Sequence, residues 1–133
     1  VVRHGKLPEF IAAESFDATI IQDVLVKIRD NQHQSIALIC KTTDEAVQLI
    51  EQLENSDIPA QLLDENSAID QQKLLVIPSH LAKGLEFDAV ILTSFDTPYD
   101  DNPLDRKLLY VALTRAMHEL YLIGPSKEAF LMK

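Results

Sequence analysis

The chain has 133 residues, of which 47% are hydrophobic and 25% are charged, so it fits one domain with a buried core and excludes intrinsic disorder. Lys and Arg number 12 against 21 Asp and Glu, which gives a net charge of -9. That charge excludes a domain that grips a nucleic-acid backbone by bulk positive charge, so any nucleic-acid contact must be local.

The hydrophobic pattern predicts helices and strands that alternate along the chain. Apolar residues recur at helical spacing over 16–31, and the apolar run at 35–40 predicts a strand that leads into a helix. Thr42 and Glu45 have the spacing of a capping box at the start of this second helix, which stops before Pro59. Short apolar runs predict further strands at 60–63, 73–78, 88–93 and 119–123.

A third helix is predicted from the cap at Asn102 and Pro103 to about Ala116, and a short final helix follows the turn at 124–126. Apolar strands with helices between them predict an α/β fold whose mostly parallel sheet is covered on both faces. The acid-rich segment 42–72 has eight Asp and Glu and no Lys or Arg, and we interpret it as a solvated surface.

The glycine and cysteine contents exclude two kinds of site. Three glycines, Gly5, Gly84 and Gly124, cannot build a phosphate-binding G-x-x-x-x-G-K-[ST] loop, so the predicted fold lacks its own P-loop. One cysteine, Cys40, excludes an internal disulfide and is interpreted as a small core residue. No Cys/His cluster has zinc-finger spacing, and no residue is singled out as a metal ligand.

Apolar runs are too short for a membrane span or a signal-peptide core, which with the single cysteine is typical of a reduced, cytoplasmic protein. The chain begins at Val1 and opens on a polar run at 3–6. We therefore expect it to be a piece of a longer polypeptide.

One candidate site is the segment from His80 to Asp88, at the carboxyl edge of the strand 73–78, where parallel sheets bind ligands. There Gly84 allows a tight turn, Glu86 can accept hydrogen bonds from ribose hydroxyls, and His80 can donate to a phosphate. A plain connecting loop is the alternative interpretation.

The other candidate is the segment from Leu108 to Ala116, an apolar helix that ends on Thr114 and Arg115. Arg115 is either a cation that complements the helix dipole or a phosphate clamp of the arginine-finger type. Phe87 and Tyr110 have rings that can stack on bases, but we predict both to be core residues.

These two segments resemble motifs V and VI of the UvrD/Rep/PcrA-like superfamily 1 helicases. The run His80-x-Ala82-Lys83-Gly84-Leu85-Glu86-Phe87-Asp88 is similar to the family's TiHkAKGLEFd, and Tyr110-Val111-Ala112-Leu113-Thr114-Arg115-Ala116 is similar to its YVAlTRA. The stretch from Ile36 to Pro59 resembles the family's iAVLyR...gIPy segment, so the similarity spans about 35–124. Residues 77–83 are also similar to the HelD branch, whose members associate with bacterial RNA polymerase.

The resemblance implies the second, C-terminal RecA-like domain of an ATP-dependent DNA helicase or translocase, with 1–133 as one three-layer domain of the P-loop NTPase type. ATP with Mg would be held mainly by an N-terminal RecA-like domain outside this chain. By the same resemblance, Gly84 and Glu86 would bind ATP, Glu86 at the ribose, and Arg115 would be the catalytic arginine finger. Ser79 and His80 would lie near the DNA backbone.

Two other functions stay open. The acidic segment and the HelD-like variant favour an interaction module for RNA polymerase with weak or vestigial motor activity. A free-standing Rossmann-like binder of small molecules is disfavoured because its glycine fingerprint is missing. In the helicase interpretation, the isolated chain is expected to be inactive as an ATPase.

Overall fold

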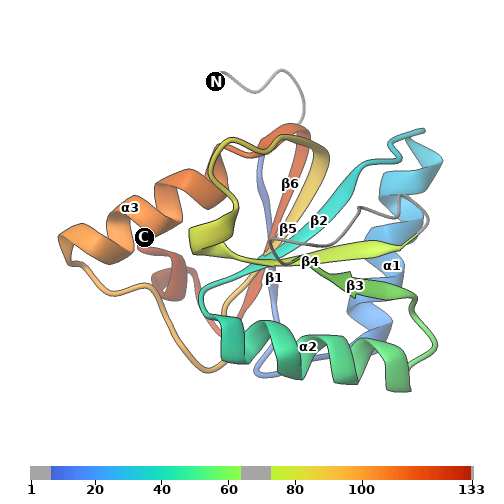
Figure 1. Cartoon of the computed structure of the whole chain (residues 1–133), viewed down its shortest axis with the longest axis horizontal. Helices are drawn as coiled ribbons and strands as arrows, with labels where there is room; N and C mark the ends of the chain where they lie inside the picture. Colours follow the sequence, from blue (N-terminus) through green and yellow to red (C-terminus); the bar gives the residue numbers. More distant parts are fainter. Residues whose placement is uncertain (1–6, 64–72, 133) are drawn as a thin grey trace.

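The computed structural model describes residues 7–63 and 73–132. Its six-stranded sheet has the order β1-β6-β5-β2-β4-β3, and each pair of neighbouring strands is parallel (Figure 1). The strands are β1 (Glu9–Ala12), β2 (Ile36–Cys40), β3 (Ala60–Leu62), β4 (Leu74–Pro78), β5 (Phe87–Thr93) and β6 (Ala116–Gly124). The helices are α1 (Ala18–Asp30), α2 (Thr43–Asn55) and α3 (Pro103–Leu113), with 3₁₀ turns η1 (Ser79–Leu81) and η2 (Lys127–Phe130).

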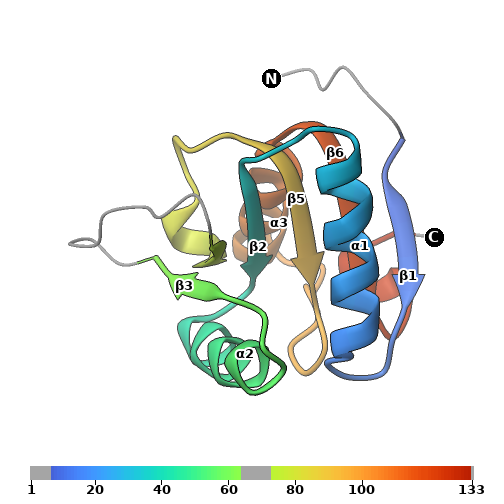
Figure 2. The same ribbon diagram turned by 90° about the vertical axis from the view of Figure 1, so that its right-hand side faces the viewer.

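Helices cover both faces of the sheet. Figure 2 shows α1 in front of the sheet and α3 behind it. Ile21 and Leu25 of α1 pack in one core cluster with Leu38 of β2, whereas Leu109 of α3 packs in the other cluster with Ile39, the next residue of β2. Successive residues of a strand point to opposite faces, so a strand buried on both sides is apolar throughout, as β2 is. The predicted three-layer α/β sandwich with a parallel sheet is confirmed.

Helix starts follow the capping residues that the sequence offers. Thr42 Oγ1 accepts a hydrogen bond from Glu45 N at 3.2 Å, and Asn102 Oδ1 accepts one from Asp105 N at 2.8 Å. Asp17, which the sequence analysis did not single out, caps α1 through Thr19 N at 2.9 Å. Each cap satisfies a backbone N–H that the first turn of a helix leaves unpaired and contributes about 1 kcal/mol.

Among the strands and α-helices, the largest differences from the sequence prediction concern β1, α3 and β6. Strand β1 was missed, because four residues at the edge of a sheet carry too short an apolar pattern to stand out. Helix α3 ends at Leu113, so Arg115 follows the helix instead of lying in its last turn. Strand β6 begins at Ala116, before the predicted start at 119. The sequence analysis missed its first residues because the polar residues before Leu120 interrupt the apolar pattern.

The surface holds two further outcomes. Tyr110 is 64% exposed, so its prediction as a core residue is wrong, whereas Phe87 is buried as predicted. In the acidic segment, Glu45 is buried and four acids, Asp44, Glu51, Glu54 and Asp57, are exposed. The other three acids lie in 64–72, outside the described residues. Gly5 and the polar run at 3–6 also lie outside the described residues. In the described part of the chain, none of the helices has the length and apolar character needed to cross a bilayer.

Cys40 gives a direct probe of this core. Its side chain is buried at the end of β2, with Sγ 3.4 Å from Thr42 O, and burial raises the thiol pKa to about 12. Because the thiolate is the reactive form, we expect no labelling of the native chain by a thiol reagent at mildly alkaline pH. Unfolding in guanidinium chloride should expose one reactive thiol. Rapid labelling under native conditions would contradict the buried position.

Candidate nucleotide-facing site

The motif V segment (His80 to Asp88) crosses from one edge of the sheet to the other. β4 ends at Pro78 on the carboxyl edge, and β5 starts at Phe87 on the amino edge, because the two strands run in the same direction. The predicted position at the carboxyl edge is therefore correct only for the first residue of the segment, His80, which lies there beside Ser79. Gly84 and Glu86 lie toward the amino edge, where the chain enters β5.

Helix α3 brings the motif VI segment (Tyr110 to Ala116) to the same amino edge. The helix returns from the end of β5 to the start of β6, and Phe87 pairs with Ala116 in the sheet register. The backbone N–H of Phe87 donates to Arg115 O at 2.9 Å. Figure 1 shows the end of α3 beside the loop that enters β5. The fold thus places Gly84, Glu86 and Arg115 at one edge, and Ser79 and His80 at the other.

The Arg115 guanidinium connects the two segments. Its Nη1 donates to Leu85 O at 3.2 Å, and its Nε donates to Val111 O at 2.9 Å, a carbonyl of the last turn of α3. Nη2 donates to Thr114 Oγ1 at 3.0 Å. The side chain therefore adds a donor to a carbonyl of the helix end that also accepts from Thr114 N at 3.3 Å, although Arg115 lies beyond the helix. Both interpretations of Arg115 require this head group at the edge, and the structure puts it there.

Gly84 adopts a conformation that other residues avoid. Its φ is +85°, and a Cβ built on it would meet no heavy atom within 4 Å, so backbone geometry rather than lack of space favours glycine. Gly84 and Glu86 are exposed, and Arg115 is partly exposed. An open backbone, a carboxylate acceptor and a guanidinium on one edge suit a ribose and a phosphate chain. These residues fit the adenosine nucleotide that the resemblance implies.

Ser79 and His80 differ in accessibility. Ser79 is 1% exposed, and its Oγ donates to Lys41 O at 2.9 Å, which ties η1 to the turn between β2 and α2. His80 is exposed at the same carboxyl edge. Of the two, only the imidazole of His80 is open to an approaching ligand in this conformation.

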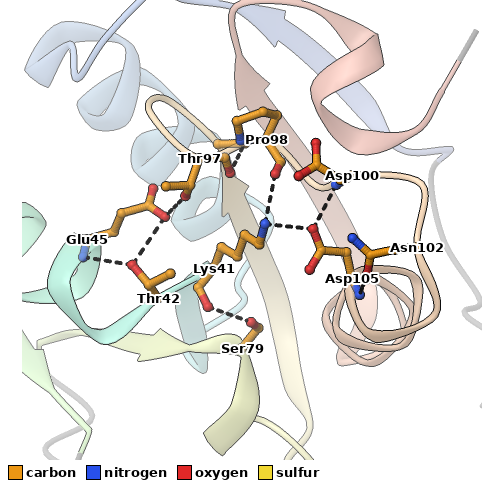
Figure 3. Close-up of polar contacts among 10 residues, drawn as sticks. Lys41, Thr42, Glu45, Ser79, Thr97, Pro98, Asp100, Asn102 and Asp105 are labelled. Atoms are coloured by element: carbon orange, nitrogen blue, oxygen red, sulfur yellow. Dashed lines mark hydrogen bonds and ion pairs between the residues drawn. The ribbon is translucent and has the colours of Figure 1, made fainter.

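A polar network that the sequence analysis missed lies at the carboxyl edge (Figure 3). Lys41 Nζ donates to Asp105 Oδ2 at 2.7 Å and to Pro98 O at 2.9 Å. Asp105 Oδ2 also accepts the backbone N–H of Asp100 at 2.8 Å. The hydrogen bond from Lys41 is the main cause that lowers the pKa of Asp105. Lys41 thus ties the end of β2 to the start of α3.

Glu45 forms the second half of this network. Its carboxylate accepts a hydrogen bond from Thr97 Oγ1 in the loop after β5, and Thr42 Oγ1 lies 3.5 Å from the same oxygen (Figure 3). Burial raises the pKa of Glu45. The sequence analysis assigned Glu45 to a capping box at the start of α2. Its carboxylate instead contacts Thr97 in the loop that follows β5.

Comparison with known proteins decides the family. The model of the UvrD-like helicase C-terminal domain matches residues 73–123, which contain both motif segments. The crystal structure of the C-terminal domain of a possible DNA helicase from Lactobacillus plantarum WCFS1 is 31% identical with a TM-score of 0.79, over 90% of this chain and 74% of that chain. The chain belongs to the UvrD-like helicase C-terminal domain family. Its fold is the RecA-like fold of these domains.

Curated relatives of this UvrD-like domain are much longer proteins. A putative ATP-dependent DNA helicase, R568, of Acanthamoeba polyphaga mimivirus is 29% identical over 117 residues, which are 71% of this chain and 17% of the relative. A probable DNA helicase of Mycoplasma pneumoniae is 33% identical over 98 residues, 65% of this chain and 18% of the relative. The C-terminal part of the Fun30 ATPase domain, 18% identical with a TM-score of 0.53, over 85% of this chain and 43% of that chain, shares the fold alone. These matches do not point to the HelD branch, which stays a prediction.

Proposed function

We propose that the chain is the second RecA-like motor domain of an ATP-dependent DNA helicase or translocase. In this proposal, ATP with Mg is bound mainly by an N-terminal RecA-like domain of the same protein, and this domain closes on it with Arg115 and Glu86. The observation that carries the proposal is the hydrogen bond from Arg115 Nη1 to Leu85 O, at 3.2 Å. It joins the motif V and motif VI segments into one surface at the amino edge of the sheet.

Arg115 is suited to act on a phosphate bound by another domain. A guanidinium carries five N–H donors and stays charged, and two carbonyls, those of Val111 and Leu85, fix its direction. Fixed donors aimed at the γ-phosphate would stabilise the charge that develops on its oxygens during transfer. Glu86, two residues before Asp88 on the same edge, would accept hydrogen bonds from the ribose.

DNA would contact the opposite edge, at the start of the motif V segment. His80 is exposed there and can donate to a backbone phosphate, while Ser79 holds η1 against Lys41. Residues 79–86 then form one continuous connection between the DNA-facing edge and the nucleotide-facing edge. In the proposed motor, ATP hydrolysis and movement on DNA communicate through this connection.

The test compares this chain with the full-length protein that contains it. We expect the chain alone to hydrolyse no ATP, because it has no P-loop, and the full-length protein to hydrolyse ATP faster with single-stranded DNA. Hydrolysis by the chain alone would contradict the division of the active site between two domains. Full-length hydrolysis that ignores DNA would contradict the motor and favour the RNA polymerase-binding alternative.

A further inference from the structure

Three potential metal ligands meet at the amino edge of the sheet. The ligand atoms that His33, Asp88 and His118 can offer lie within 4.8 Å of one another, and all three side chains are partly buried. His33 belongs to the turn between α1 and β2, Asp88 to β5 and His118 to β6. Figure 2 shows this turn and the starts of both strands together at the top of the molecule.

A β-bulge sets His118 against Asp88. Phe87 pairs with Ala116, and Ala89 pairs with Glu119, so Asp88 of β5 stands opposite two residues of β6. Bulges redirect side chains that a regular ladder would send to the other face, and they are frequent next to functional sites. The irregularity therefore falls at the position where the two strands present an imidazole and a carboxylate to each other.

The Asp88 carboxylate is already oriented by the turn that carries His33. Its Oδ2 accepts the backbone N–H groups of Gln34 and Ser35, each at 3.3 Å. This arrangement holds one carboxylate oxygen against the backbone, so we expect Oδ1 to be the oxygen that binds an ion. Oxygen and imidazole donors from three separate elements thus converge without any change of backbone.

The buried carboxylate of Glu119 lies close to the His33 ring. Nε2 of His33 is 3.4 Å from Oε2 of Glu119, whose side chain is 4% exposed. Asn31 Nδ2 lies 3.2 Å from both carboxylate oxygens of Glu119, and the Tyr121 hydroxyl donates to Oε1 at 2.8 Å. Histidine ligands of metals commonly use one nitrogen for the metal and the other for such a carboxylate, which fixes the ring. This pairing leaves Nδ1 of His33 for an ion.

Because the two imidazole rings are stacked, binding of one ion by both of them requires a side-chain rotation. Their rings stack with centroids 4.9 Å apart and an angle of 6° between the planes. An ion lies in the plane of each ring that binds it, so one ring must turn about its Cβ–Cγ bond. Ligand atoms at 2.0–2.1 Å from a tetrahedral ion are ~3.3 Å apart, which a side-chain rotation reaches from the present spacing.

We propose that His33, Asp88 and His118 form a binding site for a zinc-type transition-metal ion. Two imidazoles and one carboxylate suit Zn²⁺, whereas Mg²⁺ prefers oxygen ligands alone, and water would complete the coordination. The ion would tie the α1–β2 turn to the first residues of β5 and β6. It is separate from the Mg that accompanies ATP, and its existence does not depend on the proposed motor function.

The direct test titrates the chain with Zn²⁺ by calorimetry and with Co²⁺ by visible absorption. We expect one ion per chain, a Co²⁺ band typical of nitrogen and oxygen ligands, and a higher melting temperature with Zn²⁺. His33→Asn and His118→Asn should each weaken Zn²⁺ binding by more than about tenfold. Glu119→Gln should also weaken it, because the His33 ring loses its support. His80→Asn, at the opposite edge, is the matched control and should bind Zn²⁺ as the unchanged chain does.

Two results would overturn the site. One is the absence of Zn²⁺ and Co²⁺ binding to the folded, unsubstituted chain, which needs no variant and so is independent of any folding defect. The other is stoichiometric Zn²⁺ binding that survives the joint substitution His33→Asn and His118→Asn with circular dichroism unchanged. Binding of Mg²⁺ as tightly as Zn²⁺ would likewise contradict the imidazole ligands.

Discussion

Replacing Arg115 by Ala in the full-length protein should lower kcat for DNA-stimulated ATP hydrolysis by about a thousandfold or more, the usual effect of losing an arginine finger. The loss falls on kcat because the finger acts on charge that develops in the transition state, whereas the KM for ATP depends mainly on the domain that holds the phosphates. Steady-state kinetics with and without single-stranded DNA measure both constants.

The same substitution removes hydrogen bonds that hold the domain together. Arg115 donates to Val111 O and Leu85 O, and their loss should lower the free energy of unfolding by about 1–3 kcal/mol. Arg115→Lys keeps the charge but not the planar fork. Compared with Arg115→Ala, it should therefore recover part of the free energy of unfolding but little of kcat.

Arg106→Ala is the matched control, because Arg106 lies on α3, the helix that Arg115 follows, and its side chain is 60% exposed and paired across the surface to Asp101 at 3.3 Å. It should leave kcat unchanged. If turnover in Arg115→Ala equals that of the unchanged protein, Arg115 is a helix-end residue and the finger assignment is lost.

Much of the fold follows from local sequence signals. Thr42 and Asn102 mark helix starts because a cap acts within one turn, and β2 is apolar throughout because both of its faces are covered. The position of Gly84 in the motif V segment likewise agrees with its positive φ. Such signals depend on neighbours in the sequence, so they can be read without the structure.

The rest depends on contacts between distant residues. Glu45 meets Thr97 and His33 meets His118 only because parallel strands bring their connections to shared edges. The register shift between β5 and β6 at Asp88, where His118 comes close to its carboxylate, leaves no mark in hydrophobic periodicity. Two long motifs singled out Gly84, Glu86 and Arg115, which the fold places at one edge, but sequence patterns could not show that the motif V segment spans both edges.

Breaking the Lys41–Asp105 pair should be the most destabilising polar substitution at the carboxyl edge. The pair is 2.7 Å long, and its side chains are 16% and 8% exposed, so removing either partner leaves a poorly solvated charge. We expect Lys41→Met or Asp105→Ala to lower the free energy of unfolding by about 3 kcal/mol. Urea denaturation of both single variants and the double variant gives the coupling between them. The double variant should be more stable than the sum of the single losses predicts.

The pH dependence gives an independent check on this pair. Lys41 holds the pKa of Asp105 below its ordinary value of 3.8, so the ionised form is favoured in the folded state. The stabilisation is therefore fully present above pH 3.8 and is lost as the pH falls through the lower pKa of Asp105 in the folded state. Asp105→Asn cannot ionise, so this part of the pH dependence of stability should be absent in that variant.

Lys27→Ala, which breaks the exposed 3.6 Å pair with Glu9, is the matched control and should change stability by less than about 1 kcal/mol. Equal effects of the Lys41 and Lys27 substitutions would mean that burial does not strengthen the Lys41 contact. The end of β2 would then be held to α3 by apolar packing alone.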